Sequence, residues 1–213
     1  MARIDISTGY DAEKISRAVK AVRDGYVIVA PLENGYALLA DAFFHDAVRA
    51  LHVLRGDGLG VAAQVLIPTK KTLDGVAREV TSDAQKLAEK FWPGQLSLSV
   101  KPQLGLNWDL GDGQKLDQIS VRVPSLGFVH ALVQESGPLA VASAAVAGLA
   151  PILDSADIEF SDNEVALIFE AGVLSPTLQT TVVQCDEVGS RALRIGAISG
   201  DQLVSVVPSI YLP

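Results

Sequence analysis

Short hydrophobic runs alternate with amphipathic segments along most of this chain of 213 residues. In residues 11–24, Ile15, Val19 and Val22 recur at helical spacing, and Gly25 follows them. Apolar residues at this spacing form one face of a helix, and a glycine directly after such a segment is typical of a helix C-terminus. The pattern therefore predicts an amphipathic helix near the start of the chain.

Further elements follow from periodicity and from the content of each run. Apolar and β-branched runs predict strands, whereas apolar residues three and four apart predict helices. The expected strands cover residues 26–30, 36–40, 64–67, 96–100, 119–123, 139–142, 165–169, 181–184 and 192–195, and further helices cover 46–54, 82–91 and 128–134. Residues 102–116, rich in Gly, Asn and Asp, predict an exposed connection. Because helices and strands interleave irregularly, we expect a twisted, mixed α/β sheet rather than a doubly wound one.

Composition supports one domain with a sizeable core, which we expect to span residues 1–213, since 49% of the residues are hydrophobic. The longest apolar run, residues 139–153, contains Ser143, Gly148 and Pro151 and is shorter than the roughly 20 residues that a membrane span requires. We therefore expect buried strand and loop there, and no membrane attachment. Charges near the N-terminus occupy the place of a signal peptide's apolar stretch, so the expected compartment is the cytoplasm.

The formal net charge is −8, and its distribution says more than its sum. Residues 123–190 contain no Lys or Arg but many Asp and Glu. Nucleic-acid affinity depends on cations that neutralise phosphates, so direct RNA binding is disfavoured. Cys185 is the only cysteine, which excludes an internal disulfide, and no Cys or His cluster has metal-ligand spacing. We expect no resident metal or other cofactor, and any Mg²⁺ would arrive with a nucleotide.

Several short motifs follow one another in a defined order. They are Pro31 and Tyr36 in PLENGYALLADA, Arg55 in LRGDG, Trp92 in FWPGQLSL, Arg122 in SVRVP, Ser143 in ASAAVAG, Thr181 in TTVV, and Arg194 in LRIGAI. Their order, spacing and content resemble the YrdC-like family, whose best-known members are threonylcarbamoyl-AMP synthases. The resemblance runs from about residue 18 to residue 198, and it implies a twisted mixed sheet with flanking helices and a concave cleft.

The resemblance also implies a reaction, in which ATP, L-threonine and bicarbonate form threonylcarbamoyl-adenylate for tRNA modification and release pyrophosphate. Mg²⁺ would accompany the ATP. Cations are needed around the triphosphate, because negative charge must be stabilised as pyrophosphate leaves. The matching motifs imply nucleotide binding by Arg55, Ser143 and Arg194, and substrate binding by Tyr36, Arg122 and Thr181. Arg122 is suited to the carboxylate of threonine, since a guanidinium binds a carboxylate through two parallel hydrogen bonds.

The chain departs from the family pattern within these motifs. Where a Lys-x-Arg pair is usual, the chain has Arg55 and Asp57, and where Ser-x-Asn is usual it has Ser143 and Ala145. A unit charge about 4 Å from a phosphate is worth about 4 kcal/mol at an effective dielectric of ~20, so Asp57 predicts repulsion of ATP. Ala145 removes an amide that donates and accepts hydrogen bonds.

Other changes remove polarity from the same cleft. Leu32 and Asn34 replace hydroxyl residues in the first loop, and Val61 and Ala62 replace Lys-Pro. Two hypotheses therefore stay open. The chain is an enzyme of the threonylcarbamoyl-AMP synthase type, or it is a paralogue that has lost adenylation and binds another small anion or a protein partner.

Structural roles also fit many of these residues. Arg122 and Arg194 fit partly buried salt-bridge residues, and Ser143 fits a small core residue that bonds to the backbone. Trp92-Pro93-Gly94 fits a structural helix stop, and Gly56, Gly58 and Gly60 fit a flexible turn. For the histidines His45, His52 and His130, helix-surface or capping roles are expected.

Overall fold

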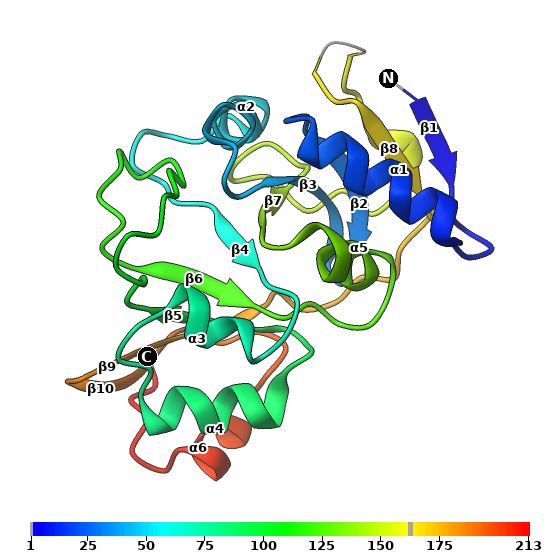
Figure 1. Cartoon of the computed structure of the whole chain (residues 1–213). Helices are drawn as coiled ribbons and strands as arrows, with labels where there is room; N and C mark the ends of the chain where they lie inside the picture. The colour runs from blue at the N-terminus through cyan, green and yellow to red at the C-terminus, as the bar shows by residue number, and fades with distance from the viewer. Residues whose placement is uncertain (1, 162–163) are drawn as a thin grey trace.

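Among the residues that the computed structural model describes, 2–161 and 164–213, ten strands form one twisted sheet (Figure 1). The strands are β1 (Ala2–Asp5), β2 (Ile28–Leu32), β3 (Gly35–Asp41), β4 (Gln64–Leu66), β5 (Leu96–Val100), β6 (Ile119–Arg122), β7 (Leu139–Ser143), β8 (Leu167–Glu170), β9 (Thr181–Asp186) and β10 (Gly189–Arg194). Their order is β1-β8-β2-β3-β7-β4-β6-β5-β9-β10. Parallel pairs such as β4 with β6 stand beside antiparallel pairs such as β2 with β3, so the predicted mixed α/β sheet is confirmed.

Three of the described helices begin at a residue whose side chain caps the first turn. The helices are α1 (Ala12–Arg23), α2 (His45–Arg55), α3 (Thr72–Val76), α4 (Ser82–Phe91), α5 (Phe128–Ser136) and α6 (Gly200–Val206), with a 3₁₀ turn at Ser155–Asp157. The Asp11 carboxylate accepts the Lys14 backbone N–H at 2.9 Å and so satisfies one of the free donors at the start of α1. Ser199 and Gln202 form a reciprocal capping box at α6.

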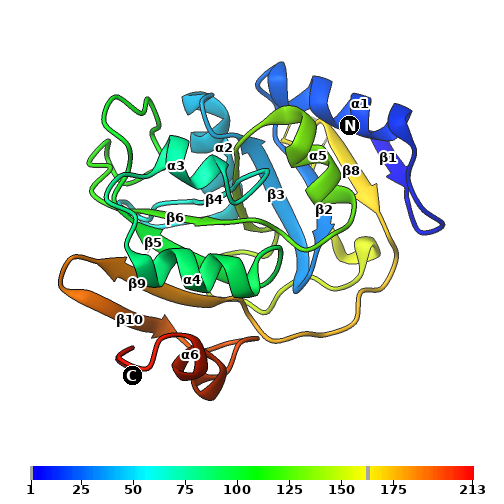
Figure 2. The ribbon, with the colours of Figure 1, turned by 60° about the horizontal axis from the view of Figure 1, so that its bottom comes forward.

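Side chains of β2 alternate between two layers of helices, which Figure 2 shows on the two faces of the sheet. Ile28 and Ala30 belong to a buried cluster that includes side chains of α1 and α5. Val29 points the other way and packs in a cluster with α2. Successive side chains of a strand face opposite sides of a sheet, so one strand stabilises both layers. The β3 strand behaves in the same way, and this places the β2–β3 turn at the edge of a rigid core.

A third buried cluster lies beneath α3, α4 and α6, on strands β4, β5, β6 and β9. Trp92, just after α4, is 4% exposed and donates its indole N–H to the carbonyl of Leu96 at 2.6 Å. The Gly94 backbone N–H donates to the carbonyl of Val123 at 3.0 Å. The Trp92-Pro93-Gly94 stop therefore has the structural role expected of it, since it fixes the entry into β5 on β6.

The expected exposed connection at residues 102–116 is wrong for part of its length. Trp108 is 4% exposed and Leu110 is fully buried, and both belong to the third cluster. The Gly-rich and Asp-rich composition indicated a loop correctly, but the prediction did not take into account that Trp108 and Leu110 anchor this loop in the core. The connection is consequently held against the core rather than free in solvent.

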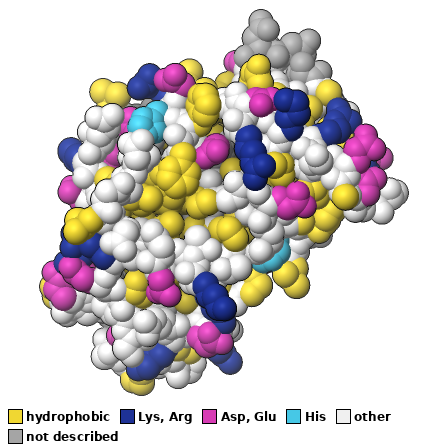
Figure 3. Space-filling view, viewed as in Figure 1, with side chains coloured by type: hydrophobic (Ala, Val, Ile, Leu, Met, Phe, Trp, Pro, Cys, Tyr) yellow, Lys and Arg dark blue, Asp and Glu magenta, His cyan; other side chains and the backbone are white. Residues whose placement is uncertain are grey.

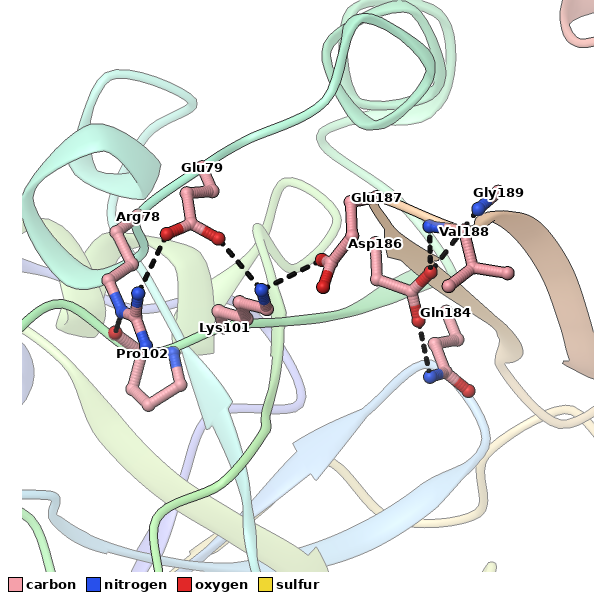
Figure 4. A network of polar contacts seen from close by, with 9 residues as sticks. All are labelled: Arg78, Glu79, Lys101, Pro102, Gln184, Asp186, Glu187, Val188 and Gly189. Carbon is pink, nitrogen blue, oxygen red and sulfur yellow. Dashed lines mark hydrogen bonds and ion pairs between the residues drawn. The ribbon is translucent and has the colours of Figure 1, made fainter.

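A surface network of ion pairs ties the chain after α3 to the β9–β10 hairpin (Figure 4). Glu79 contacts Arg78 at 2.7 Å and Lys101 at 2.8 Å, and Lys101 also contacts Glu187 at 2.7 Å. The hydrogen bonds to Glu187 and Glu79 raise the pKa of Lys101 above its ordinary value. Because these groups are exposed, water and salt screen them, and we assign the network to local order rather than to stability.

One face of the molecule carries hydrophobic side chains near its centre, with charged side chains around them (Figure 3). Phe43 and Phe44, directly before α2, are 50% and 42% exposed, and Phe43 contacts Trp108 edge to face.

None of the helices in the described part of the chain has the length and apolar character that crossing a bilayer requires.

Candidate functional site

Six stretches of chain line a cavity of about 340 Å³. They are the β2–β3 turn, the end of α2 with the connection to β4, the end of β6, the end of β7 with the loop that follows it, the residues just before β9, and the end of β10. The charged residues in its described lining are Arg55, Asp57, Arg122 and Arg194. These side chains come from segments far apart in the sequence, so the fold gathers them at one place.

The β2–β3 turn can approach the opposite wall closely because residue 35 is glycine. Gly35 has a φ of 135°, in the region that favours glycine, and a Cβ there would lie 2.8 Å from Cβ of Pro151. The next backbone N–H, of Tyr36, donates to the carbonyl of Ile152 at 2.9 Å. The turn and the loop after β7 therefore form one packed wall of the cavity.

Arg122 carries its charge in an almost dry environment. The residue is 2% exposed, and its Nη2 donates to Oε2 of Glu33 at 2.9 Å. Its Nε and Nη1 are also buried, yet neither has a hydrogen-bond partner among the residues that the structure describes. A buried donor without an acceptor is costly, so the N–H groups on these two nitrogens are suited to an anion in the cavity.

Glu33 is the internal counterion of Arg122. Its second carboxylate oxygen accepts the backbone N–H of Ser125 at 2.7 Å. Burial alone would raise the pKa of Glu33, but the charge of Arg122 and the N–H bond from Ser125 outweigh that effect and lower the pKa below its ordinary value. Glu33 is therefore ionised at neutral pH and holds Arg122 in place.

Arg194 stands close enough to Arg122 for the two charges to interact. Its Nε donates to the carbonyl of Thr180 at 2.9 Å, which fixes the side chain beside the cavity. Burial and then the charge of Arg122 lower the pKa of Arg194. An anion between two guanidinium groups would relieve this repulsion, so the pair is suited to bind one.

Asp57, which also lines the cavity, lies between the side chains of Arg55 and His52. Its Oδ1 lies 3.1 Å from Nε of Arg55, and its Oδ2 lies 2.8 Å from Nδ1 of His52. The side chain of Asp57 is only 4% exposed. The helix-surface or capping role expected for His52 is wrong, because the ring is 12% exposed and contacts a carboxylate that lines the cavity.

Comparisons with known proteins identify the group to which this site belongs. The Sua5/YciO/YrdC family model, described as telomere recombination, matches residues 20–196. The chain belongs to the Sua5/YciO/YrdC family. A Mycobacterium tuberculosis protein named "Putative threonylcarbamoyl-AMP synthase" is 34% identical over 203 residues, which cover 92% of each chain. The threonylcarbamoyl-AMP synthase of Bacillus subtilis is 28% identical, over 93% of this chain and 58% of that protein.

Solved structures share this fold. The crystal structure of Pyrococcus abyssi Sua5 complexed with L-threonine has a TM-score of 0.89 and 24% identity, covering 99% of this chain. This chain spans only 62% of that Sua5 chain. Escherichia coli YciO has a TM-score of 0.80 and 24% identity, covering 92% of this chain and 95% of YciO.

Other residues expected from the Sua5/YciO/YrdC motifs lie at or near the cavity in different ways. Tyr36 lines it but is 1% exposed, and its hydroxyl donates to the carbonyl of Gly172 at 2.7 Å. Ser143 lines it at the end of β7, and its Oγ accepts the backbone N–H of Ala145 at 3.2 Å. Ser143 therefore combines a cavity position with the backbone contact that its structural interpretation requires.

Thr181 is not among the described residues that line the cavity, although the neighbouring Thr180 is. It is fully buried, and its hydroxyl donates to the carbonyl of Ile198 at 2.8 Å. The same oxygen accepts the backbone N–H groups of Gly196 and Ile198 at 2.9 and 3.0 Å. All of its hydrogen-bonding capacity is internal, so the structure gives Thr181 a part in holding the chain after Arg194, with no contact to the cavity.

The structure also adds residues that the sequence did not indicate. Gln64, Gln179 and Thr180 line the cavity, and Glu33 supports Arg122 from the first loop. Leu32, Asn34, Val61 and Ala62 lie in the same lining, where the motif comparison had placed them. Glu33 stands in the matched first-loop motif, but nothing in its surroundings indicates a partner 89 residues away.

Proposed function

We propose that this chain is an enzyme of the threonylcarbamoyl-AMP synthase type, which uses ATP, L-threonine and bicarbonate and releases pyrophosphate. The observation that carries the proposal is the buried guanidinium of Arg122, whose Nε and Nη1 have no partner beside a cavity that also contains Arg194. Membership of the Sua5/YciO/YrdC family and the synthases among the relatives support this choice of substrates.

In this proposal the carboxylate of L-threonine binds the free N–H groups of Arg122, while Glu33 keeps that side chain in position. Arg55 and Arg194 contact the phosphates of ATP, and Ser143 contributes a hydroxyl. Tyr36 shapes the wall of the substrate site. The product supplies tRNA modification in the cytoplasm.

Magnesium enters this reaction as part of the substrate, Mg·ATP. Mg²⁺ usually keeps several water ligands and binds through one or two carboxylates together with phosphate oxygens. In residues 2–161 and 164–213, no three His, Cys, Asp or Glu side chains are grouped to hold a metal ion.

The test is pyrophosphate release from Mg·ATP in the presence of L-threonine and bicarbonate, with calorimetric titration of each substrate. Arg122→Gln should abolish threonine binding, because a neutral amide cannot replace two charged N–H donors. Arg17→Gln, on the exposed face of α1, is the matched control and should leave binding unchanged. Threonine binding that survives Arg122→Gln would contradict the assignment.

A second candidate function is supported by the position of Asp57. In the motif comparison this carboxylate replaces a cation, and Ala145 replaces an amide, so the cleft is a poorer site for a triphosphate. The chain would then bind a small carboxylate without adenylating it. Saturable binding of L-threonine with no heat from Mg·ATP up to millimolar concentration, a limit of roughly −4 kcal/mol, would favour this function. Gain of ATP binding in Asp57→Arg/Ala145→Asn would then identify the two lost groups.

A further inference from the structure

Both ring nitrogens of His52 contact oxygen atoms. Nδ1 lies 2.8 Å from Oδ2 of Asp57, and Nε2 lies 2.7 Å from the backbone carbonyl oxygen of Leu110. A carboxylate and a carbonyl only accept hydrogen bonds, whereas a neutral imidazole has a single N–H to donate. With Asp57 ionised, only the imidazolium form donates to both oxygen atoms, so the two contacts favour a ring that carries a proton on each nitrogen.

Packing prevents the ring from leaving this position. Gly111 has a φ of 96°, and a Cβ on it would overlap Nε2 of His52 and lie 2.8 Å from the carbonyl oxygen of Val61. The connection that contains Gly111 thus presses its backbone against the ring, and Leu110 beside it is fully buried. His52 is therefore held between a buried loop and the carboxylate of Asp57.

Protonated His52 changes the charge that the cavity presents to a ligand. Arg55 and His52 contribute two positive charges around Asp57, which contributes one negative charge, so this group keeps one net positive charge. Without His52, Arg55 and Asp57 would cancel. Arg122 and Arg194 contribute two positive charges and Glu33 contributes one negative charge, so this second group also has a net charge of +1. The net charge of the whole cleft is then +2.

We propose that His52 is a positioning residue for a phosphate subsite. It holds and neutralises Asp57, so that Arg55 keeps its charge for a pyrophosphate group in the cavity. The inference rests on the proposed use of this cleft for a phosphate-bearing substrate. His52 itself lines a separate surface cavity of about 540 Å³ and acts through Asp57, which lines both.

The other charged and titratable groups near the ring do not supply the same contact. His45 and Arg49 lie on α2, and Asp109 lies on the connection opposite, in the surface cavity that His52 lines. Arg49 pairs with Asp46 at 3.2 Å, and His45 contacts the carbonyl oxygen of Asn107 at 3.3 Å. His45 thus resembles His52 in bonding to the same connection but lacks a carboxylate partner, which makes it a matched control.

The test uses inorganic pyrophosphate as the probe, titrated into the full chain at neutral pH and at several salt concentrations. His52→Gln should bind pyrophosphate roughly tenfold more weakly, the effect of one unit charge about 10 Å away at an effective dielectric of about 20. Its affinity should also fall less steeply with salt, because one charge has gone. His52→Gln/Asp57→Asn should recover the affinity, and His45→Gln should leave it unchanged.

A second measurement does not depend on any variant folding. Correlations between ring protons and ring nitrogens in the wild-type NMR spectrum should show two protonated nitrogens in His52 at neutral pH. A neutral His52 ring, unchanged pyrophosphate affinity and salt dependence in folded His52→Gln, or no pyrophosphate binding by the wild type would each overturn the inference. Pyrophosphate binding without pyrophosphate release from Mg·ATP would contradict the synthase reaction alone and would leave the role of His52 standing.

Discussion

Replacing Glu33 by Gln tests whether the buried ion pair beneath the cavity supports the fold. Glu33 is 14% exposed at its side chain and Arg122 is 2% exposed, and their contact is 2.9 Å long. Gln keeps the size of the side chain and an oxygen for the Ser125 N–H, but it removes the charge that balances Arg122. The variant would leave a buried cation whose three guanidinium nitrogens have no charged partner.

The size of the effect follows from burial. Removing one partner of a buried pair costs about 3–5 kcal/mol, because the remaining charge has lost both water and its counterion. We expect about 3 kcal/mol for Glu33→Gln, since the amide oxygen retains part of the hydrogen bonding. For a chain of this size, that corresponds to a fall of roughly 6–12 °C in melting temperature.

The assay is urea unfolding together with thermal unfolding, at pH values from 8 to 3. The pKa of Glu33 is lowered in the folded state, so its charge stabilises the fold fully above the ordinary value of 4.5 and loses that effect as the pH falls through the folded value. The difference between wild type and Glu33→Gln should therefore stay constant above pH 5.5 and shrink in acid below 4.5. Glu89→Gln, which removes an exposed pair with Lys70, is the control and should change little. A loss below about 1 kcal/mol for Glu33→Gln would refute the reasoning.

Three further outcomes are expected. Gly35→Ala should lower the free energy of unfolding, measured in urea, by about 1–3 kcal/mol, because its φ of 135° and the nearby Pro151 leave no room for a Cβ. Wild-type stability would show that the turn relaxes freely. Burial raises the pKa of Cys185 to about 11, so a disulfide reagent at pH 8 should modify the native protein slowly and the urea-unfolded protein rapidly, whereas equal rates would place the thiol in solvent. Thr181→Val should lower the free energy of unfolding by about 2–4 kcal/mol and speed hydrogen exchange at the Ile198 N–H, since buried backbone groups lose their partner. Unchanged exchange would contradict this.

Local patterns predicted the elements that depend on neighbouring residues. The helix expected at residues 11–24 is observed as Ala12–Arg23, because its cap and its apolar spacing are encoded within the same segment. The strand Ala2–Asp5 was missed, since four residues with little alternation form a strand only beside β8, whose partner residues begin at Leu167. The helices Thr72–Val76 and Gly200–Val206 were also missed, as each is short and takes its stability from packing on the third cluster.

Candidate residues were predicted better than their contacts. The matched motifs indicated Arg55, Arg122, Ser143 and Arg194, and all of them line one cavity. Thr181 was indicated by the same comparison, yet its hydroxyl points to the backbone of residues 196–198. A motif match states that a residue type is present, but it does not say which of two adjacent threonines faces the cavity.

The sequence by itself determined the inventory of charges, the order of the motifs and the class of sheet, because these depend on composition and on spacing along the chain. Only the tertiary structure decided how the charges are paired. Arg122 and Glu33 are 89 residues apart in the sequence, and Asp57 reaches Arg55 and His52 because the chain turns back at Gly56, where α2 ends. The physical reason is that an ion pair depends on distance through space and on exclusion of water, and folding alone sets these two quantities.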